Sequence, residues 1–266
     1  MSEIQKYVKK FNENGFVVIP NVIKQKEINQ IYNALINLVE KYTCKKYKGS
    51  EPWNNNQFHK DLELLHELDG KNFSKLYDSL QTHSIIQKIG ISEKILKITS
   101  NLLEKNKKVP WKNLSNTPPL FRMDLPKKDD HKVDWHQERV SYDQNDDGNN
   151  GLIVWIPLQN VNRKTGTLDV CIGSHKSGFI KPSHSGTYGN IQTSNKFIDE
   201  NLLKKYSKLS VKMNMGDVLF VSMLTAHKSG KMDFTRKFRF TVTTRIHNSF
   251  SDDFNPGRLR FIRNSN

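Results

Sequence analysis

The feature that most constrains the fold is a change of hydrophobic periodicity near residue 109. Before it, apolar residues recur at steps of three and four, the spacing of amphipathic helices. After it, short apolar runs alternate with turn residues, at 119–125, 151–158, 167–172, 209–213, 217–223 and 238–246. Closely spaced short strands after a helical first third predict a β sandwich or barrel with helices packed on its outside.

The helical third contains two long amphipathic zones, at residues 24–42 and about 72–103. A short helix is expected before Gly15, and the β-branched run at 16–19, bounded by Gly15 and Pro20, predicts an early strand. The length suits one large domain. We therefore expect a single domain over residues 1–266, mainly β with flanking helices, in which a helical third (about 1–108) packs on a β core (about 109–250).

Three polar segments are expected to be loops. Residues 145–150 (NDDGNN) have a central glycine, and residues 181–195 are rich in Ser, Gly and His and are placed to cover a site. Residues 51–60 connect the two helical zones and carry Trp53 and His59, which makes this loop a candidate lid.

The chain is strongly basic, with 42 Lys+Arg against 27 Asp+Glu and a formal net charge of +15. Such a charge fits nucleic acid, an anionic membrane surface, an acidic substrate or a merely lysine-rich surface. The lysines are spread along the chain, without a basic block or an aromatic-interleaved motif. We interpret most of them as solvated surface and expect no nucleic-acid partner, although a basic nucleic-acid-binding module remains an alternative.

Cysteine content and hydropathy bear on the compartment. Two cysteines, Cys44 and Cys171, cannot form a disulfide framework, and no apolar run reaches the ~18 residues of a membrane helix. The first twenty residues lack a secretory leader pattern. We expect a cytoplasmic protein without a membrane partner.

The chemistry-bearing motif is His136-Gln137-Glu138. On a strand, residues two apart share a face, so His136 and Glu138 can reach one metal ion together. His227, at the end of the apolar strand that follows the turn at 215–216, is the best third ligand. Two imidazoles and one carboxylate on one face of an ion are typical of non-haem Fe(II) oxygenases.

Several motifs occur in an order that resembles a known family. These are GFVVIPNV (15–22), FRMDLP (121–126) ahead of HQE (136–138), WIPL (155–158), GTL (166–168), GSHK (173–176), GD (216–217) and HKSG (227–230). Together, over about residues 12–247, they resemble the phytanoyl-CoA dioxygenase-like Fe(II)/2-oxoglutarate-dependent oxygenases.

The resemblance implies a double-stranded β-helix (jelly-roll, cupin-like) barrel, with Fe(II), 2-oxoglutarate and O2 as cofactor and cosubstrates. It implies that His136, Glu138 and His227 bind iron and that Gln137 and Trp155 line the cosubstrate pocket. Ser229 matches the hydroxyl that helps to hold a carboxylate of 2-oxoglutarate. The implied reaction is hydroxylation of a C–H bond of a small metabolite with release of succinate and CO2.

The family also places an arginine about eleven residues after the distal histidine, and here that position falls between Arg236 and Arg239. Strand parity favours Arg239, because it alternates with Thr241, Thr243 and Arg245 on a polar face. The opposite apolar face, at positions 238, 240, 242 and 246, suits packing beneath helices.

The chain departs from the family pattern in two places. Glu138 stands where the family usually has Asp, which needs a slightly wider pocket, and Ile172 stands where Pro is favoured. Because a carboxylate is present, iron has no vacancy for chloride at this position, so hydroxylation is favoured over halogenation. A cupin-like metal-binding or other small-molecule-binding protein without oxygenase activity is the alternative.

Other side chains carry weaker expectations. Arg122, Arg139, Tyr142 and Arg245 either line the substrate side or form structural ion pairs. His175 is expected to pack a loop. The primary partner is a small molecule, and basic residues at the pocket mouth would argue that it is anionic.

Overall fold

The computed structural model describes residues 1–49, 51–103, 109–125, 133–141, 150–188, 191–232, 237–252 and 254. Its helices are α1 (Glu3–Asn14), α2 (Gln25–Thr43), α3 (Asn56–Leu68), α4 (Gly70–Gln81), α5 (Ser84–Gly90) and α6 (Glu93–Leu103). Its strands are β1 (Phe16–Ile19), β2 (Leu114–Asn116), β3 (Leu120–Asp124), β4 (Gly151–Pro157), β5 (Leu168–Cys171), β6 (His184–Tyr188), β7 (Ile191–Phe197), β8 (Lys208–Ser210), β9 (Val218–Ser222), β10 (His227–Ser229) and β11 (Arg239–Asn248).

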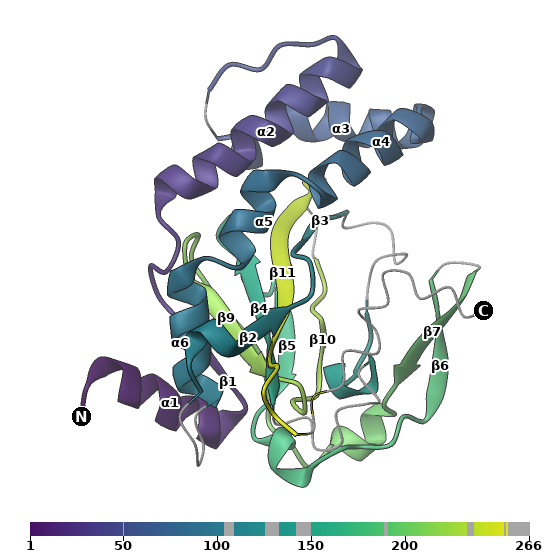
Figure 1. Ribbon diagram of the computed structural model, residues 1–266. Helices are drawn as coiled ribbons and strands as arrows, with labels where there is room; N and C mark the ends of the chain where they lie inside the picture. The colour runs from purple at the N-terminus through teal and green to yellow at the C-terminus, as the bar shows by residue number, and fades with distance from the viewer. Residues whose placement is uncertain are drawn as a thin grey trace, which may run out of the picture.

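The strands form two main antiparallel sheets and a hairpin (Figure 1). The larger sheet has the order β1-β9-β4-β11-β2, with β3 also paired to β11, and the smaller has the order β10-β5-β8. β6 pairs with β7 apart from both sheets. Each sheet thus combines strands that are distant in sequence, as in a double-stranded β-helix.

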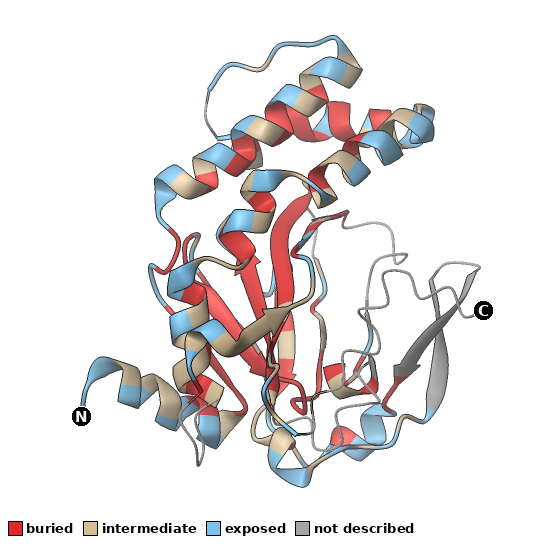
Figure 2. Ribbon diagram, in the orientation of Figure 1, coloured by how far each residue is buried: buried red, intermediate tan, exposed pale blue. Residues whose placement is uncertain are grey.

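The central strands of the larger sheet, β9, β4 and β11, are buried and red along most of their length, whereas the edge strand β2 is intermediate (Figure 2). On the outer face, Phe240, Val242 and Ile246 join one apolar cluster with side chains of the helices. α5 contacts β3 and β11, and α6 contacts β4 and β11. On the inner face, Trp155 and Leu219 belong to a second cluster that includes residues of the smaller sheet.

These observations confirm the predicted fold class, a double-stranded β-helix core with flanking helices. The predicted apolar face of β11 is also confirmed, because it packs beneath the helices. In the part of the chain that the structure describes, no helix has both the length and the apolar character of a membrane span.

Hydrogen bonds at the C-terminal end of α1 connect this helix to the barrel. Ser2 caps α1, and the helix ends at Gly15, whose φ of 82° lies in the left-handed region that favours glycine. The Gly15 carbonyl accepts hydrogen bonds from the Ser222 amide and the Thr225 hydroxyl, and a Cβ at Gly15 would lie 2.3 Å from that hydroxyl oxygen. α1 therefore braces the segment that leads to His227.

Two predicted loops are regular structure instead. The prediction of a lid at 51–60 was wrong, because α3 begins at Asn56 and His59 lies buried within it. Trp53 lies in a short 3-10 turn (Pro52–Asn54) and packs against Tyr32. The Asn55 side chain caps α3. This N-cap residue is a helix-start signal in the sequence, but the polar composition of the segment led to the prediction of a loop.

The predicted loop at 181–195 was also wrong, because most of it forms the β6–β7 hairpin. Its side chains alternate too weakly in hydropathy to show strand periodicity in the sequence. The predicted loop at 145–150 falls, except for Asn150, outside the described residues.

His59 joins the helices to β11. Its Nδ1 accepts a hydrogen bond from the Phe238 amide, and its Nε2 donates to the Trp53 carbonyl. Its ring stacks on Phe238 and Phe240. Burial lowers the pKa of His59 from 6.5 to about 4.

We predict that His59 makes folding acid-sensitive. Because its pKa is lower in the folded chain, the stabilisation is complete above pH 6.5 and is lost as the pH falls toward 4, where the unfolded chain binds the extra proton. Between pH 7 and 5 the native chain should lose about 2 kcal/mol more unfolding free energy than the variant His59→Gln. Urea unfolding at both pH values measures this, and equal losses in the two proteins would contradict it.

Candidate metal centre

The backbone brings His136 and His227 together. The His136 amide donates to the His227 carbonyl at 3.0 Å, and the His227 amide donates to the His136 carbonyl at 2.9 Å. The two form an isolated antiparallel bridge, and their ring centroids lie 4.2 Å apart. β10, which begins at His227, pairs on its other side with β5.

The expectation of a strand through His136 and Glu138 was wrong in detail. His136 makes only this single bridge, and Glu138 begins the 3-10 turn η4 (Glu138–Ser141). The carboxylate nevertheless reaches the histidines, with Oε2 at 3.7 Å from Nε2 of His136 and 4.0 Å from Nε2 of His227. One ligand atom from each of the three residues lies within 4.8 Å of the others.

Hydrogen bonds fix the tautomers of both imidazoles. Nδ1 of His136 lies 2.7 Å from the Asp134 carbonyl, and Nδ1 of His227 lies 2.8 Å from the Thr225 carbonyl. A carbonyl only accepts, so each Nδ1 carries the proton and each Nε2 presents a lone pair to the cluster. This arrangement is typical of metal-binding histidines.

The charge states of Glu138 and His227 also suit metal ligands. Burial alone would raise the pKa of Glu138, but the Arg245 guanidinium outweighs it and holds that pKa well below its ordinary value. Burial lowers the pKa of His227 to about 3. An ionised carboxylate and a neutral imidazole are the forms that bind a divalent cation.

Arg239, the first residue of β11, is buried. Its Nε and Nη2 donate to Oδ2 of Asp124 at 3.2 and 2.6 Å, and its Nη1 donates to the Thr167 carbonyl at 3.3 Å. Asp124 faces Arg239 across the β3–β11 pair and also accepts from Arg122 at 2.9 Å. Burial would raise the pKa of Asp124, but the two guanidinium groups hold it well below its ordinary value.

Ser229, Trp155 and Thr241 lie near Arg239. The Thr167 carbonyl that binds Arg239 also accepts from the amide of Gly230, the residue after Ser229. The Trp155 ring lies 5.8 Å from the guanidinium carbon. Thr241, two residues along β11 and on the same face, has a buried hydroxyl with no hydrogen-bond partner among the described residues. The Thr167 carbonyl therefore links the Arg239 guanidinium to the backbone next to Ser229, and Thr241 lies on the same face of β11.

Gln137 stands apart from that group. Its amide nitrogen donates to the carbonyls of Gly178 and Leu224, and its amide oxygen accepts from the Ile180 amide. These contacts hold the segment after β5 in place. Its role in the cosubstrate pocket stays a prediction.

The remaining expectations have mixed outcomes. Arg122 and Arg245 both form ion pairs, with Asp124 and Glu138, and the Arg139 guanidinium lies 5.1 Å from the Phe179 ring. His175 packs a loop as expected, because its Nε2 donates to the Asn12 carbonyl. Arg236 and Tyr142 lie outside the described residues.

Sequence reasoning missed the roles of Asp124 and His247. His247 is buried and extends the polar parity of β11 by one more position, so the alternation could have indicated it. Asp124 alternates with Arg122 on β3, but only the pairing of β3 with β11 sets it opposite Arg239.

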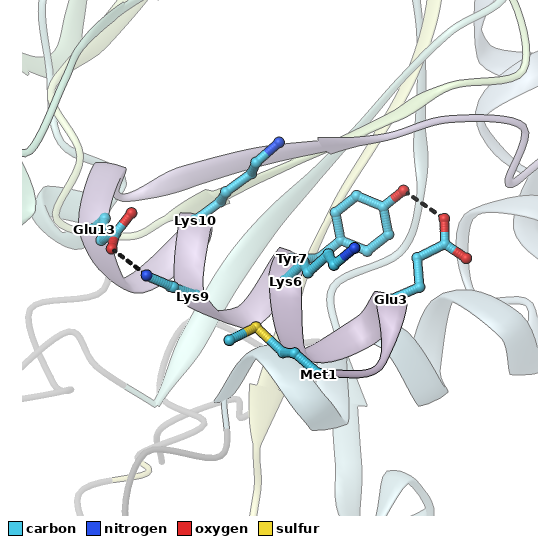
Figure 3. Close-up of a pocket in the computed structure, with 7 residues that line it drawn as sticks. All are labelled: Met1, Glu3, Lys6, Tyr7, Lys9, Lys10 and Glu13. Carbon is cyan, nitrogen blue, oxygen red and sulfur yellow. Dashed lines mark hydrogen bonds and ion pairs between the residues drawn. The ribbon is translucent and has the colours of Figure 1, made fainter.

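A hollow of about 670 Å³ lies along α1 (Figure 3). Its lining comes from Met1 and α1 alone, with Lys6, Lys9 and Lys10 among the side chains. None of the predicted site residues contributes to it, so we assign it no catalytic role.

Comparisons with known proteins agree on the fold. The epimerase SnoN, in complex with Fe3+, alpha ketoglutarate and nogalamycin RO, has a TM-score of 0.59 at 13% identity over 92% of this chain and 83% of its own. The carbocyclase SnoK from nogalamycin biosynthesis has a TM-score of 0.57 at 16% identity over 99% and 92%. EvdO2 from Micromonospora carbonacea var. aurantiaca, complexed with 2-oxoglutarate, has a TM-score of 0.55 at 15% identity over 93% and 91%. Among curated protein sequences, none matches.

The barrel of this chain thus has the fold of structures that bind Fe3+ or 2-oxoglutarate, and it contains a candidate His-Glu-His metal cluster. Residues 11–238 match the phytanoyl-CoA dioxygenase (PhyH) family. The chain belongs to that family, as the order of its motifs predicts.

We predict that Asp124→Asn is strongly destabilising. The substitution leaves the buried Arg239 guanidinium without its carboxylate, and removing one partner of a buried pair costs about 3 kcal/mol or more. Urea unfolding measures this loss. The comparison variant Glu93→Gln removes the solvent-exposed pair with Lys97 and should change stability far less. Equal effects of the two substitutions would contradict the prediction.

Proposed function

We propose that the protein is a non-haem Fe(II)- and 2-oxoglutarate-dependent dioxygenase that hydroxylates a C–H bond of a small metabolite, with release of succinate and CO2. The observation that carries this proposal is the cluster of His136, Glu138 and His227, in which two oriented Nε2 atoms and one carboxylate oxygen converge. Three such ligands on one side of an ion leave positions for a chelating cosubstrate and for O2.

The donor set fits iron. Imidazole nitrogen with a carboxylate oxygen suits Fe(II), and the protonated Nδ1 atoms keep each ring in one orientation. Bound there with 2-oxoglutarate, iron supplies the oxidising chemistry that couples O2 reduction to attack on a C–H bond. The residues of this chain hold the ligand atoms in place and keep the site buried.

The polar group around Arg239 fits the distal carboxylate of 2-oxoglutarate. The hydrogen bonds of Arg239 to Asp124 and Thr167 use three of its five N–H groups. A buried hydroxyl without a partner, as at Thr241, costs free energy unless a bound molecule accepts from it. We assign Arg239 and Ser229 to the carboxylate, with the Trp155 ring forming a wall beside them.

The reaction type and the substrate class are the less defined parts of this proposal. SnoN is an epimerase and SnoK a carbocyclase, so this fold supports reactions other than hydroxylation. An anionic small molecule stays a proposal that rests on the basic composition of the chain, because Arg122 and Arg245 are already paired with Asp124 and Glu138. A cupin-like metal-binding protein without oxygenase activity remains the competing interpretation.

The function predicts metal-dependent consumption of 2-oxoglutarate. Purified protein with Fe(II), 2-oxoglutarate and air should produce succinate, and His227→Ala should abolish this, because one of three metal ligands is lost. Succinate is quantified by mass spectrometry with and without candidate metabolites. His83→Asn, which replaces one helix-capping residue of α5 with another, should retain full turnover.

Two results would overturn the proposal. One is the absence both of succinate and of a thermal shift with 2-oxoglutarate, which would favour the cupin-like interpretation. The other is full activity of His227→Ala, which would remove the ligand assignment.

We also predict that Arg239→Lys weakens the binding of 2-oxoglutarate. Lysine keeps the charge but loses the planar fork, so the Michaelis constant for 2-oxoglutarate should rise about 10- to 100-fold, as expected for loss of a charged hydrogen bond. Steady-state kinetics measure this, and a melting curve confirms that the variant folds. Ser229→Ala should show a smaller rise, and an unchanged Michaelis constant in both would contradict the assignment.

A further inference from the structure

The Glu138 carboxylate has a third neighbour besides the two histidines. Nε of Arg245 donates to Oε1 of Glu138 at 2.8 Å. The other carboxylate oxygen, Oε2, is the one that faces Nε2 of His136 and of His227. The two oxygens of Glu138 therefore have different partners.

The backbone of Arg245 is held from both sides. Arg245 pairs with Ile153 of β4. On its other side its amide donates to the Thr117 hydroxyl oxygen, and its carbonyl accepts from the Thr117 amide. The neighbouring Thr244 hydroxyl also donates to the Thr117 carbonyl. These contacts fix the strand position from which the Arg245 side chain reaches Glu138.

A glutamate at this position needs such a contact. Its side chain has one more rotatable bond than aspartate, and an unrestrained carboxylate binds a cation through either oxygen or both. Because Glu138 begins the turn η4 and is not held in a regular strand, its backbone alone does not fix the carboxylate. Arg245 takes one oxygen and leaves a single oxygen for the ion.

We propose that Arg245 is a positioning residue that holds Glu138 as a one-oxygen metal ligand. The inference rests on the proposed metal site but not on the identity of the reaction. Arg245 touches the carboxylate and acts through it, so its effect should depend on the glutamate side chain.

A purely electrostatic role of Arg245 and a positioning role predict opposite effects of its removal on metal affinity. A guanidinium close to a divalent cation repels it, so a purely electrostatic Arg245 would weaken metal binding, and its removal would strengthen that binding. Positioning predicts that removal weakens binding, because the carboxylate must then be ordered when the ion arrives. The direction of the change therefore separates the two roles.

The test is Co(II) affinity of the metal-free protein, measured by calorimetry without 2-oxoglutarate. Arg245→Met should weaken Co(II) binding about tenfold, the lower end of the effect of losing a contact behind a metal ligand. Arg245→Lys, which keeps the charge but not the Nε–H donor, should weaken it less. Arg163→Met removes an exposed arginine charge and should leave the affinity unchanged.

A double-mutant cycle makes the dependence on Glu138 explicit. Glu138→Asp shortens the side chain away from Arg245, so Arg245→Met in that background should weaken Co(II) binding little further. Unchanged or tighter binding by both Arg245 variants, or a full tenfold loss in the Glu138→Asp background, would overturn the inference. Melting curves confirm that each variant folds.

The outcomes also separate this inference from the proposed function. Native protein that binds Co(II) with the expected Arg245 effect, but produces no succinate with Fe(II), would overturn only the proposed function. Succinate production with Co(II) affinity insensitive to Arg245 would overturn only the positioning role. Absence of Co(II) binding by the native protein would overturn the metal site on which both depend.

Discussion

Side-chain alternation along β11 is the constraint on which the rest of this structure depends. One face of the strand places Phe240, Val242 and Ile246 against the helices, where burial of apolar surface stabilises the fold. The other face places Arg239 and Arg245 toward the interior of the barrel. A shift of one residue in register would exchange the faces, so packing against the helices also fixes the site.

The two interior guanidinium groups depend on carboxylates from other segments. Asp124 on β3 pairs with Arg239, and Glu138 in the turn after His136 pairs with Arg245. Buried charges of this kind are tolerated only when they are paired and hydrogen-bonded. The same pairs orient the groups that we assign to the cosubstrate and the metal, which links the stability of the barrel interior to the geometry of the site.

The sequence predicted the regular parts well where periodicity was strong. The helix at 24–42 and the strand at 151–158 are present almost as expected, as α2 and β4. It failed at α3 and the β6–β7 hairpin, because short polar segments carry weak periodicity and tertiary contacts decide their conformation. His59 shows this, since its two hydrogen bonds and its ring stacking join distant elements.

By itself the sequence determined the family, the residue types of the candidate metal site and the two faces of β11, since these depend on local spacing and motif order. Only the tertiary structure decided which atoms meet. The bridge between His136 and His227 joins residues 91 positions apart, and the Arg245 contact with Glu138 spans 107. Such contacts follow from strand pairing across the barrel, which no local pattern encodes.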